Sequence, residues 1–352
     1  MSTTVPNQEA ERHNAHEASG TARLPVNIRA VLIPVLVGLM IGGLFVGVFL
    51  SAFHDPKPHG LPVAVVAPAS VVSTVQSQAA AADNALDVLA YPDRTAALNA
   101  VLDRTVLGAF VVGPQGPELL IAGANGPSVT QTLQGAFGAA AQASGKPLNT
   151  SDVSPLSSGD SRALSIFYGA FGVVLAAFLF ALTSMQIGSA LAAGWRALSA
   201  AVFAVGIGVV VAVLIQPIFG ALPAPFLTTT ALVALLALAI AATTAALLKV
   251  FGSAGTFIAS VLLLVLGNAT STGILPAQFL PGWLEPLAPV LPVGVAVRAL
   301  RGAAYFANDG LVSGLLILTA WTVGAGLVFT VAARRQLRSQ QALDGRHAAV
   351  VA

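Results

Sequence analysis

The sequence predicts a polytopic α-helical membrane protein. The predicted fold has six transmembrane helices, an extracytoplasmic α/β domain between helices 1 and 2, and re-entrant helices between helices 5 and 6. Charged residues make up 9% of the 352 residues, against about 25% in a soluble domain, and the mean hydropathy is +0.84. Several uncharged apolar runs also reach the ~20 residues with which a helix crosses the ~30 Å hydrocarbon core of a bilayer.

The first apolar run, Ala30–Phe53, is predicted to be a retained membrane anchor within residues 29–53. It is longer than the roughly 7–15 apolar residues of a signal-peptide core, and no small-x-small cleavage site follows Phe53 directly. Residues 164–333 are predicted to hold the other five spans. These are Leu164–Ile187, Ala197–Ile215, Phe226–Leu248, Val250–Leu266 and Leu311–Ala333.

The distribution of charge predicts the orientation. Six spans place both termini on one side, and that side carries nine basic and four acidic residues, a net charge of +5. The opposite side carries seven basic and ten acidic residues, a net charge of −3. The positive-inside rule therefore predicts cytoplasmic tails at 1–28 and 334–352.

Residues 54–163 are predicted to form the extracytoplasmic α/β domain, because short β-rich runs alternate there with helical ones. The Gly113–Pro117 turn should join the last two strands as a hairpin. The acidic residues of this domain are scattered, and we interpret them as solvated surface charges. No catalytic, cofactor-binding or metal-binding residue is predicted, so we expect no enzyme. The expected strands are Val63–Val66, Leu86–Ala90, Val106–Val112 and Leu119–Ala122, and the expected helices are Val71–Ala82, Asp93–Arg104 and Ser128–Ser144.

Two features of the membrane part bear on its function. No ionisable residue lies in the middle of any predicted span, which argues against a proton-driven antiporter because such transporters use intramembrane relays. The first span carries two pairs of glycines four residues apart, which are predicted to form a helix-packing face. Such pairs also arise by chance in a chain with 34 glycines. The four residues are Gly38, Gly42, Gly43 and Gly47.

The segment 267–310 is predicted to be re-entrant, because five prolines interrupt a strongly apolar stretch. After Pro292, residues Val293–Phe306 can form one helix with Arg298 and Arg301 three residues apart on the same face. Arginines near an outer interface usually reach toward lipid headgroups, and contact with a ligand is the alternative.

This segment carries a family resemblance. GNATSTGILPAQFLPGWLEPLAPVLPVGVAVRALRGAAYF (267–306) resembles a G-N-x-[ST]-[ST]-G…P…LPG…LPxGxAxxALR…YF segment of the permeases of the type-2 ABC exporter superfamily. It looks closest to the YhgE/Pip (phage infection protein) branch. DVSPLSSGDSRAL (152–164), before the second span, resembles the Asp-x-x-Pro-Leu…Asp…Arg entry of that branch into the membrane.

The resemblance implies a homodimer in a bacterial plasma membrane, with an export path for a hydrophobic or lipid-like compound. It further implies a separate ATP-binding subunit, contact with membrane lipid, no cofactor and no nucleic-acid partner. Trp195 and Arg196, within residues 188–198, would couple the chain to the ATPase. An aromatic belt and the positive-inside rule would also explain these two residues. The first span and the re-entrant region would line the path, with Asn268, Trp283, Arg298 and Arg301 as its residues.

The alternative function is a membrane receptor or scaffold, similar to the phage infection protein, that acts through its outer domain without transport.

Overall fold

The computed structural model describes residues 28–143, 145–187 and 191–351. The chain divides into two compact units, Met1–Gly42 and Gly43–Ala352. Helix α2 (Ile28–Phe53) begins in the first unit and ends in the second.

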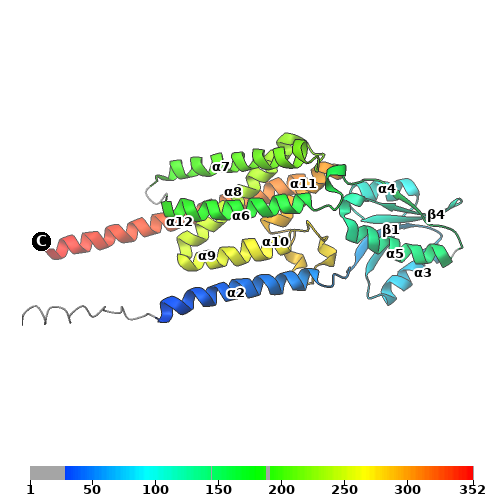
Figure 1. The fold of residues 1–352 in the computed structure, drawn as a ribbon, viewed down its shortest axis with the longest axis horizontal. Coiled ribbons are helices and arrows are strands. Elements are labelled where there is room, and N and C mark those ends of the chain that lie inside the picture. The colour runs from blue at the N-terminus through cyan, green and yellow to red at the C-terminus, as the bar shows by residue number, and fades with distance from the viewer. Residues whose placement is uncertain (1–27, 144, 188–190, 352) are drawn as a thin grey trace, which may run out of the picture. The chain divides into compact units, whose positions relative to one another are not determined.

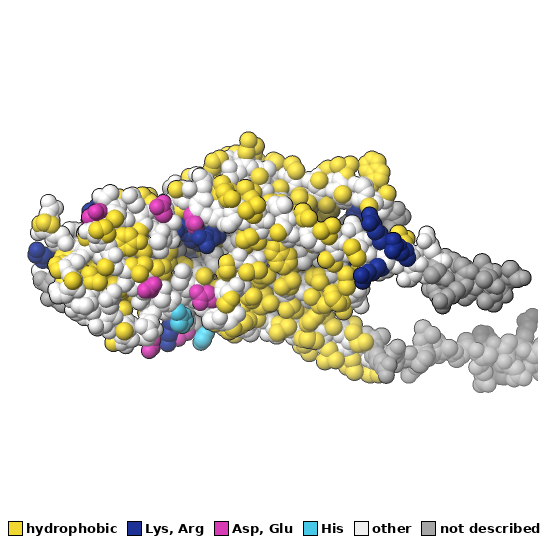
Figure 2. Space-filling model, turned by 180° about the vertical axis from the view of Figure 1, so that it is seen from behind, with side chains coloured by type: hydrophobic (Ala, Val, Ile, Leu, Met, Phe, Trp, Pro, Cys, Tyr) yellow, Lys and Arg dark blue, Asp and Glu magenta, His cyan; other side chains and the backbone are white. Residues whose placement is uncertain are grey.

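Five of the described helices are long and apolar enough to cross a membrane. Their length and composition indicate a multi-pass α-helical membrane protein, as predicted. In Figure 2, hydrophobic side chains cover the helical part of the molecule and charged side chains gather toward its two ends. The five helices are α2, α6 (Ser165–Ile187), α7 (Ala193–Val213, extended by a π-helical turn at Leu214–Ile218), α8 (Phe226–Phe251) and α12 (Leu311–Val351).

The segment expected to form the fifth span is a shorter apolar helix of 17 residues, Ser253–Ala269. It consists of α9 (Ser253–Ala259), a π-helical stretch Ser260–Leu266 and α10 (Gly267–Ala269). Gly252 separates it from α8 by adopting a φ of +60°, a value that glycine accepts without steric cost. A sixth crossing therefore remains a prediction.

Helix α8 lies at the centre of the helical core, which we define as α6, α7, α8, α11 (Pro292–Tyr305) and α12 (Figure 1). Leu232, Leu236 and Ile240 of α8 are completely buried there. Gly208 of α7 permits close approach of the two helices, because a Cβ at this position would lie 2.6 Å from the carbonyl oxygen of Thr230. Small residues serve this purpose in membrane helices generally.

The α/β domain is a five-stranded sheet of order β2-β1-β3-β4-β5 between helices on both faces (Figure 1). β1 is parallel to β2 and β3, β3 and β4 form an antiparallel hairpin, and β4 is parallel to β5. Alternate residues of the strands face opposite helices, as the period of two requires. The strands are β1 (Leu61–Val66), β2 (Leu86–Ala90), β3 (Gly108–Gly113), β4 (Gly116–Ile121) and β5 (Asn149–Asp152).

Helices α3 (Ala69–Ala81) and α5 (Pro127–Ala143) cover one face of this sheet, and α4 (Arg94–Leu102) covers the other. Val63 and Phe137 belong to the first cluster of buried side chains, whereas Ala64 and Val101 belong to the second. The first four strands and three helices lie where the sequence predicted them. Sequence analysis missed β5, because Asn-Thr-Ser-Asp has none of the apolar alternation that indicates a strand.

The α/β domain joins the helical core through the end of α11 and the start of α6. Ser154 Oγ donates to the Tyr305 carbonyl oxygen at 3.1 Å, and the Ser157 N–H donates to the Tyr305 hydroxyl at 3.3 Å. Asp160 accepts hydrogen bonds from the backbone N–H of Leu164 at 2.9 Å and of Ser165, and thereby caps α6. Asp160 is buried, so the expectation that every acid of this domain is a solvated surface charge is wrong at this position.

Candidate functional site

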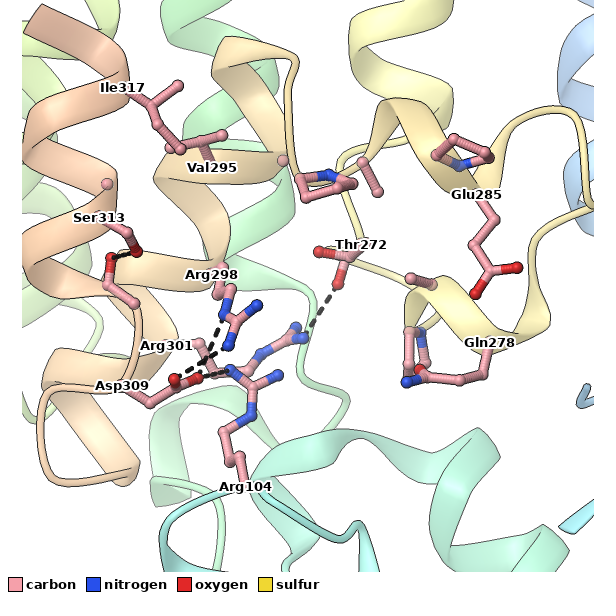
Figure 3. A pocket seen from close by; sticks show the side chains of 18 of the residues that line it. Arg104, Thr272, Gln278, Glu285, Val295, Arg298, Arg301, Asp309, Ser313 and Ile317 are labelled. Carbon is pink, nitrogen blue, oxygen red and sulfur yellow. Dashed lines mark hydrogen bonds and ion pairs between the residues drawn. The ribbon is translucent and has the colours of Figure 1, made fainter. Parts of the chain in front are cut away.

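A cavity of about 630 Å³ lies where the α/β domain meets the helical core (Figure 3). We call it the junction cavity. Four segments form its walls, namely the turn after α4, the connection between α10 and α11, α11 itself and the first turns of α12. In Figure 3, Arg104, Arg298, Arg301 and Asp309 gather at one end, away from the aliphatic side chains of Val295 and Ile317. The cavity is thus amphipathic.

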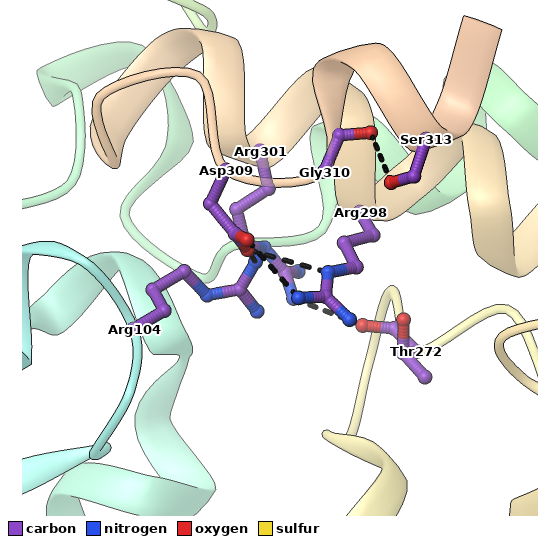
Figure 4. A network of polar contacts seen from close by, with 7 residues as sticks. All are labelled: Arg104, Thr272, Arg298, Arg301, Asp309, Gly310 and Ser313. Atoms are coloured by element: carbon purple, nitrogen blue, oxygen red, sulfur yellow. Dashed lines mark hydrogen bonds and ion pairs between the residues drawn. The ribbon is translucent and has the colours of Figure 1, made fainter. Parts of the chain in front are cut away.

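Asp309 connects two of the arginines (Figure 4). Its Oδ2 accepts a hydrogen bond from Arg104 Nη1 at 3.1 Å, and its Oδ1 accepts one from Arg298 Nη2 at 3.0 Å. The side chains of Arg104 and Asp309 are 15% and 19% exposed, so this ion pair is largely shielded from water. The guanidinium group of Arg104 also lies 4.9 Å from the centre of the Phe306 ring.

The third arginine, Arg301, forms no ion pair with a carboxylate among the described residues and is 3% exposed. Its Nη1 donates to the Thr272 carbonyl oxygen at 2.9 Å, and its Nη2 donates to that of Gly273 at 3.0 Å. Burial, followed by the nearby charge of Arg104, lowers the pKa of Arg301 to about 10, although the carboxylate of Asp160 acts in the opposite direction, so the group stays protonated at neutral pH. Arg301 is therefore a buried cation that is hydrogen-bonded to neutral carbonyl groups and forms no ion pair among the described residues.

This burial argues against headgroup contact for Arg301, which was one of the two alternatives predicted for the arginines of α11. The side chain of Arg298 is 55% exposed, but Arg301 points into the protein. Burying a cation costs several kcal/mol unless an anion compensates it. Two carbonyl oxygens compensate only part of this cost, because they carry no net charge.

The loop between α11 and α12 brings Asp309 to the arginines. Gly302 makes this path possible, because a Cβ there would lie 1.7 Å from the Asp309 carbonyl oxygen. The Asn308 N–H donates to the Gly302 carbonyl oxygen at 3.0 Å, and the Asp309 N–H donates to that of Phe306 at 2.7 Å. Hence a small residue on α11 allows the chain to turn back across the helix.

Several non-glycine residues at the cavity have a left-handed backbone. Arg104 has a φ of +56°, Thr272 one of +55° and Asn308 one of +69°. Arg104 follows the last residues of α4, a position where glycine is usual because it lacks a Cβ. Such conformations cost about 1 kcal/mol or more and persist where the surrounding contacts demand them. At Arg104, the contact with Asp309 stabilises this backbone conformation.

The remaining residues predicted for the export path lie outside the junction cavity. Asn268 is completely buried, and its Nδ2 donates to the Leu264 carbonyl oxygen at 2.8 Å. Trp283 is 54% exposed in the connection between α10 and α11. Of the predicted residues, Arg298 and Arg301 line the cavity. Sequence analysis missed Arg104 and Asp309, which are 205 positions apart and share no motif.

The residues predicted to contact an ATPase lie at the start of α7. Residues 188–190 are outside the described residues. Helix α7 begins at Ala193, four residues before the expected span start at Ala197, and it includes Trp195 and Arg196. Trp195 is 66% exposed. Arg196 instead packs on its own chain, where Nη1 lies 3.2 Å from Met185 Sδ.

The predicted glycine face belongs to both units. Gly38 and Gly42 lie in the first unit, and Gly43 and Gly47 in the second. Within the second unit, a Cβ added at Gly43 or Gly47 would meet no atom within 4 Å. These two positions are therefore open to another helix.

In the described part of the chain, no group of three His, Asp or Glu residues could hold a metal ion. The observed features define a class of protein, which is a multi-pass helical membrane protein with an α/β domain and a basic, amphipathic cavity at their junction. The chain matches no protein-family model, and comparisons with curated proteins and with solved structures find no match.

Proposed function

We propose that this chain is the membrane permease subunit of a type-2 ABC-like exporter, which moves a hydrophobic or lipid-like compound outward. The amphipathic junction cavity is the observation that carries the proposal. It combines arginines at one end with aliphatic side chains at the other, and a lipid-like molecule has the same division. The segment 267–306, which resembles that permease superfamily, contributes much of its lining.

The source of energy in this proposal is ATP hydrolysis on a separate subunit. The predicted spans have no ionisable residue at mid-depth that could relay protons. Exposed Trp195 at the start of α7 supplies a contact point for such a subunit, because aromatic side chains contribute much of the binding energy at interfaces.

The proposal includes six crossings, cytoplasmic termini and an α/β domain outside a bacterial plasma membrane. The charge difference between the two sides, +5 against −3, supports this orientation. A homodimer completes the proposed assembly, with Gly43 and Gly47 at a helix–helix contact. The open space over these glycines supports that contact.

A receptor or scaffold that acts through its α/β domain is the second candidate function. A smaller cavity of about 230 Å³ between α3 and α5 favours it, because this cavity belongs to the domain alone. Val75, Ala79 and Phe137 are among its lining residues.

Purification in mild detergent separates the two candidates. An exporter subunit should co-purify with an ATPase from its native membrane. The isolated complex should then move a fluorescent phospholipid analogue across proteoliposome membranes when ATP is added, and a variant ATPase that cannot hydrolyse ATP is the control. Absence of any ATPase, together with unchanged lipid distribution, would reject the exporter and favour the receptor.

A further inference from the structure

We propose that the junction cavity binds the phosphate headgroup of an anionic amphiphile, with Arg298 and Arg301 as its ligands and Asp309 occupying the headgroup position when no ligand is bound. This inference deepens the proposed function, because it names the chemical class of substrate. The site itself consists of described residues of a single chain.

Charge is the first argument. Three arginines line the cavity against two carboxylates, Glu285 and Asp309. Asp309 bonds to Arg104 and Arg298, and no ion pair joins Glu285 to an arginine among the described residues. Arg301 forms no ion pair among the described residues, and the charge of Asp160 only partly offsets its burial, since the pKa of Arg301 is still lowered to about 10. An oxyanion in the cavity would compensate this buried charge.

Unused hydrogen-bond donors are the second argument. The Nε atoms of Arg104 and Arg301 are both buried and lack a hydrogen-bond partner within the described residues. A buried N–H group without an acceptor is destabilising, because it has lost its hydrogen bonds to water. In Figure 4 the side chains of the three arginines gather near Asp309, which accepts hydrogen bonds from Arg104 and Arg298. The arrangement therefore has more donors than its own carboxylate can satisfy.

The geometry of arginine favours phosphate in that volume. A planar guanidinium group offers paired N–H donors that match two oxygens of a phosphate or carboxylate. Asp309 already accepts from Arg298 in this paired manner, with Nε–Oδ2 and Nη2–Oδ1 distances of 3.3 and 3.0 Å. A phosphate adds further acceptor oxygens for Arg301. It can thus replace the Asp309 carboxylate and also satisfy the unpaired cation.

The apolar end of the cavity favours an amphiphile over a simple anion as the ligand. Val295 of α11 and Ile317 of α12 lie beyond the arginines (Figure 3), and three prolines of the adjoining connection also line the cavity. An inorganic phosphate would leave these apolar side chains without a partner. A headgroup with attached acyl chains would cover both ends and gain from the burial of apolar surface.

Displacement of Asp309 would also break the ion pair that joins the α/β domain to the helical core. Arg104 belongs to the domain, and Asp309 to the loop between α11 and α12. The bound headgroup would take over the contact to Arg104. Ligand binding would therefore exchange a contact within the protein for one made through the ligand.

Binding to the full chain, without any ATPase, tests the inference. The protein in zwitterionic nanodiscs is titrated with dioleoyl phosphatidic acid, dioleoyl phosphatidylcholine or inorganic phosphate, and bound ligand is counted by native mass spectrometry. We expect at least tenfold preference for phosphatidic acid over phosphatidylcholine. Inorganic phosphate should compete only weakly. Equal binding of all three would overturn the proposal. If inorganic phosphate bound as tightly as phosphatidic acid, the ligand would be a free oxyanion, and the proposal of an amphiphile would be wrong.

Substitutions test which residues form the binding site. Arg298→Gln and Arg301→Met should each lower phosphatidic acid affinity at least tenfold, whereas Arg94→Gln, which changes an arginine elsewhere on the domain, should leave it unchanged. Asp309→Asn removes the competing carboxylate and should raise the affinity severalfold. Because misfolding cannot raise affinity, this variant keeps the test valid if an arginine variant unfolds. Unchanged or lower affinity in Asp309→Asn would contradict the displacement. If these binding tests fail, the exporter proposal is still tested separately by co-purification of an ATPase.

Discussion

Arg104 donates a hydrogen bond to Asp309 across 205 positions of sequence, at an Nη1–Oδ2 distance of 3.1 Å. The pair links the turn after α4 in the α/β domain to the loop between α11 and α12 in the helical core. Burial is the largest influence on Arg104 and lowers its pKa, although the carboxylate of Asp309 acts in the opposite direction. Asp309 thus stabilises two cations at the junction, Arg104 and Arg298.

Replacement of Asp309 by Asn should destabilise the ligand-free protein. The substitution keeps the shape of the side chain and leaves Arg104 shielded from water without its counter-charge. Breaking a buried pair in this way costs about 3 kcal/mol. Thermal unfolding in detergent, followed by intrinsic fluorescence, should show a Tm several degrees lower. Asp55→Asn is the control, because the Asp55–Lys57 pair is 62% and 75% exposed and its loss should leave the Tm unchanged.

The orientation predicts different labelling of two introduced cysteines. The native chain has no Cys, so each variant has a single reactive site. Gln115→Cys, in the exposed turn between β3 and β4, should react with a membrane-impermeant maleimide in intact cells. Ser339→Cys, on the exposed end of α12, should react only after permeabilisation. The reverse pattern would invert the proposed topology.

The glycine face predicts a specific loss of dimerisation. Gly43→Leu and Gly47→Leu should leave folding intact, because a Cβ at either position meets no atom of the second unit. Both should shift the chain toward a monomer if another copy packs there, since bulky side chains prevent close helix approach. Mass photometry in nanodiscs measures the ratio of monomer to dimer. Gly206→Leu on α7, another open glycine, is the control, and equal effects of all three would remove the specific contact.

Trp195 and Arg196 should behave differently from each other. Trp195→Ala should weaken ATPase binding and uncouple hydrolysis from export at normal Tm, because the exposed ring has few contacts to lose. Arg196→Ala should lower the Tm, since it removes contacts with Met185 and, at 5.8 Å, with the Phe329 ring. Pull-down and ATPase assays check the coupling. Normal complex formation and export in the double variant would assign both residues to the aromatic belt and the positive-inside rule.

The α/β domain should lose stability in acid through Glu118. Hydrogen bonding from Arg94, at 2.8 Å, is the largest influence that lowers the pKa of Glu118 below its usual 4.5. A carboxylate with a lowered pKa contributes stability above about pH 4.5, and this contribution is lost as the pH falls through the folded-state value. The pair is partly exposed, so the effect should be about 1 kcal/mol or less. Arg94→Gln should reduce the decrease in Tm between pH 6 and pH 3, and an unchanged decrease would contradict this role.

Local patterns were sufficient for most helices and strands. Apolar runs of bilayer length predicted α2, α6, α7, α8 and α12, because backbone groups in hydrocarbon must bond within their own segment. Pro292 correctly predicted the start of α11, since proline suits the first turn of a helix. The polar edge strand β5 was missed, and Asp160 was misinterpreted. The strand depends on β4, which is distant in sequence. Asp160 instead bonds to the backbone N–H groups of Leu164 and Ser165, only four and five positions away, and its burial is a property of the folded chain.

The sequence by itself determined the class of this protein, because the length of the apolar runs and the placement of prolines are local properties of the chain. It also marked Arg298 and Arg301 as neighbours on one helix face. Only the tertiary structure decided that one of them is exposed and the other is buried and forms no ion pair among the described residues, because burial depends on how the α/β domain and the segment after α10 pack on α11. The tertiary structure alone also brought Arg104 and Asp309 into the same cavity, since their contact requires the α11–α12 loop to cross Gly302.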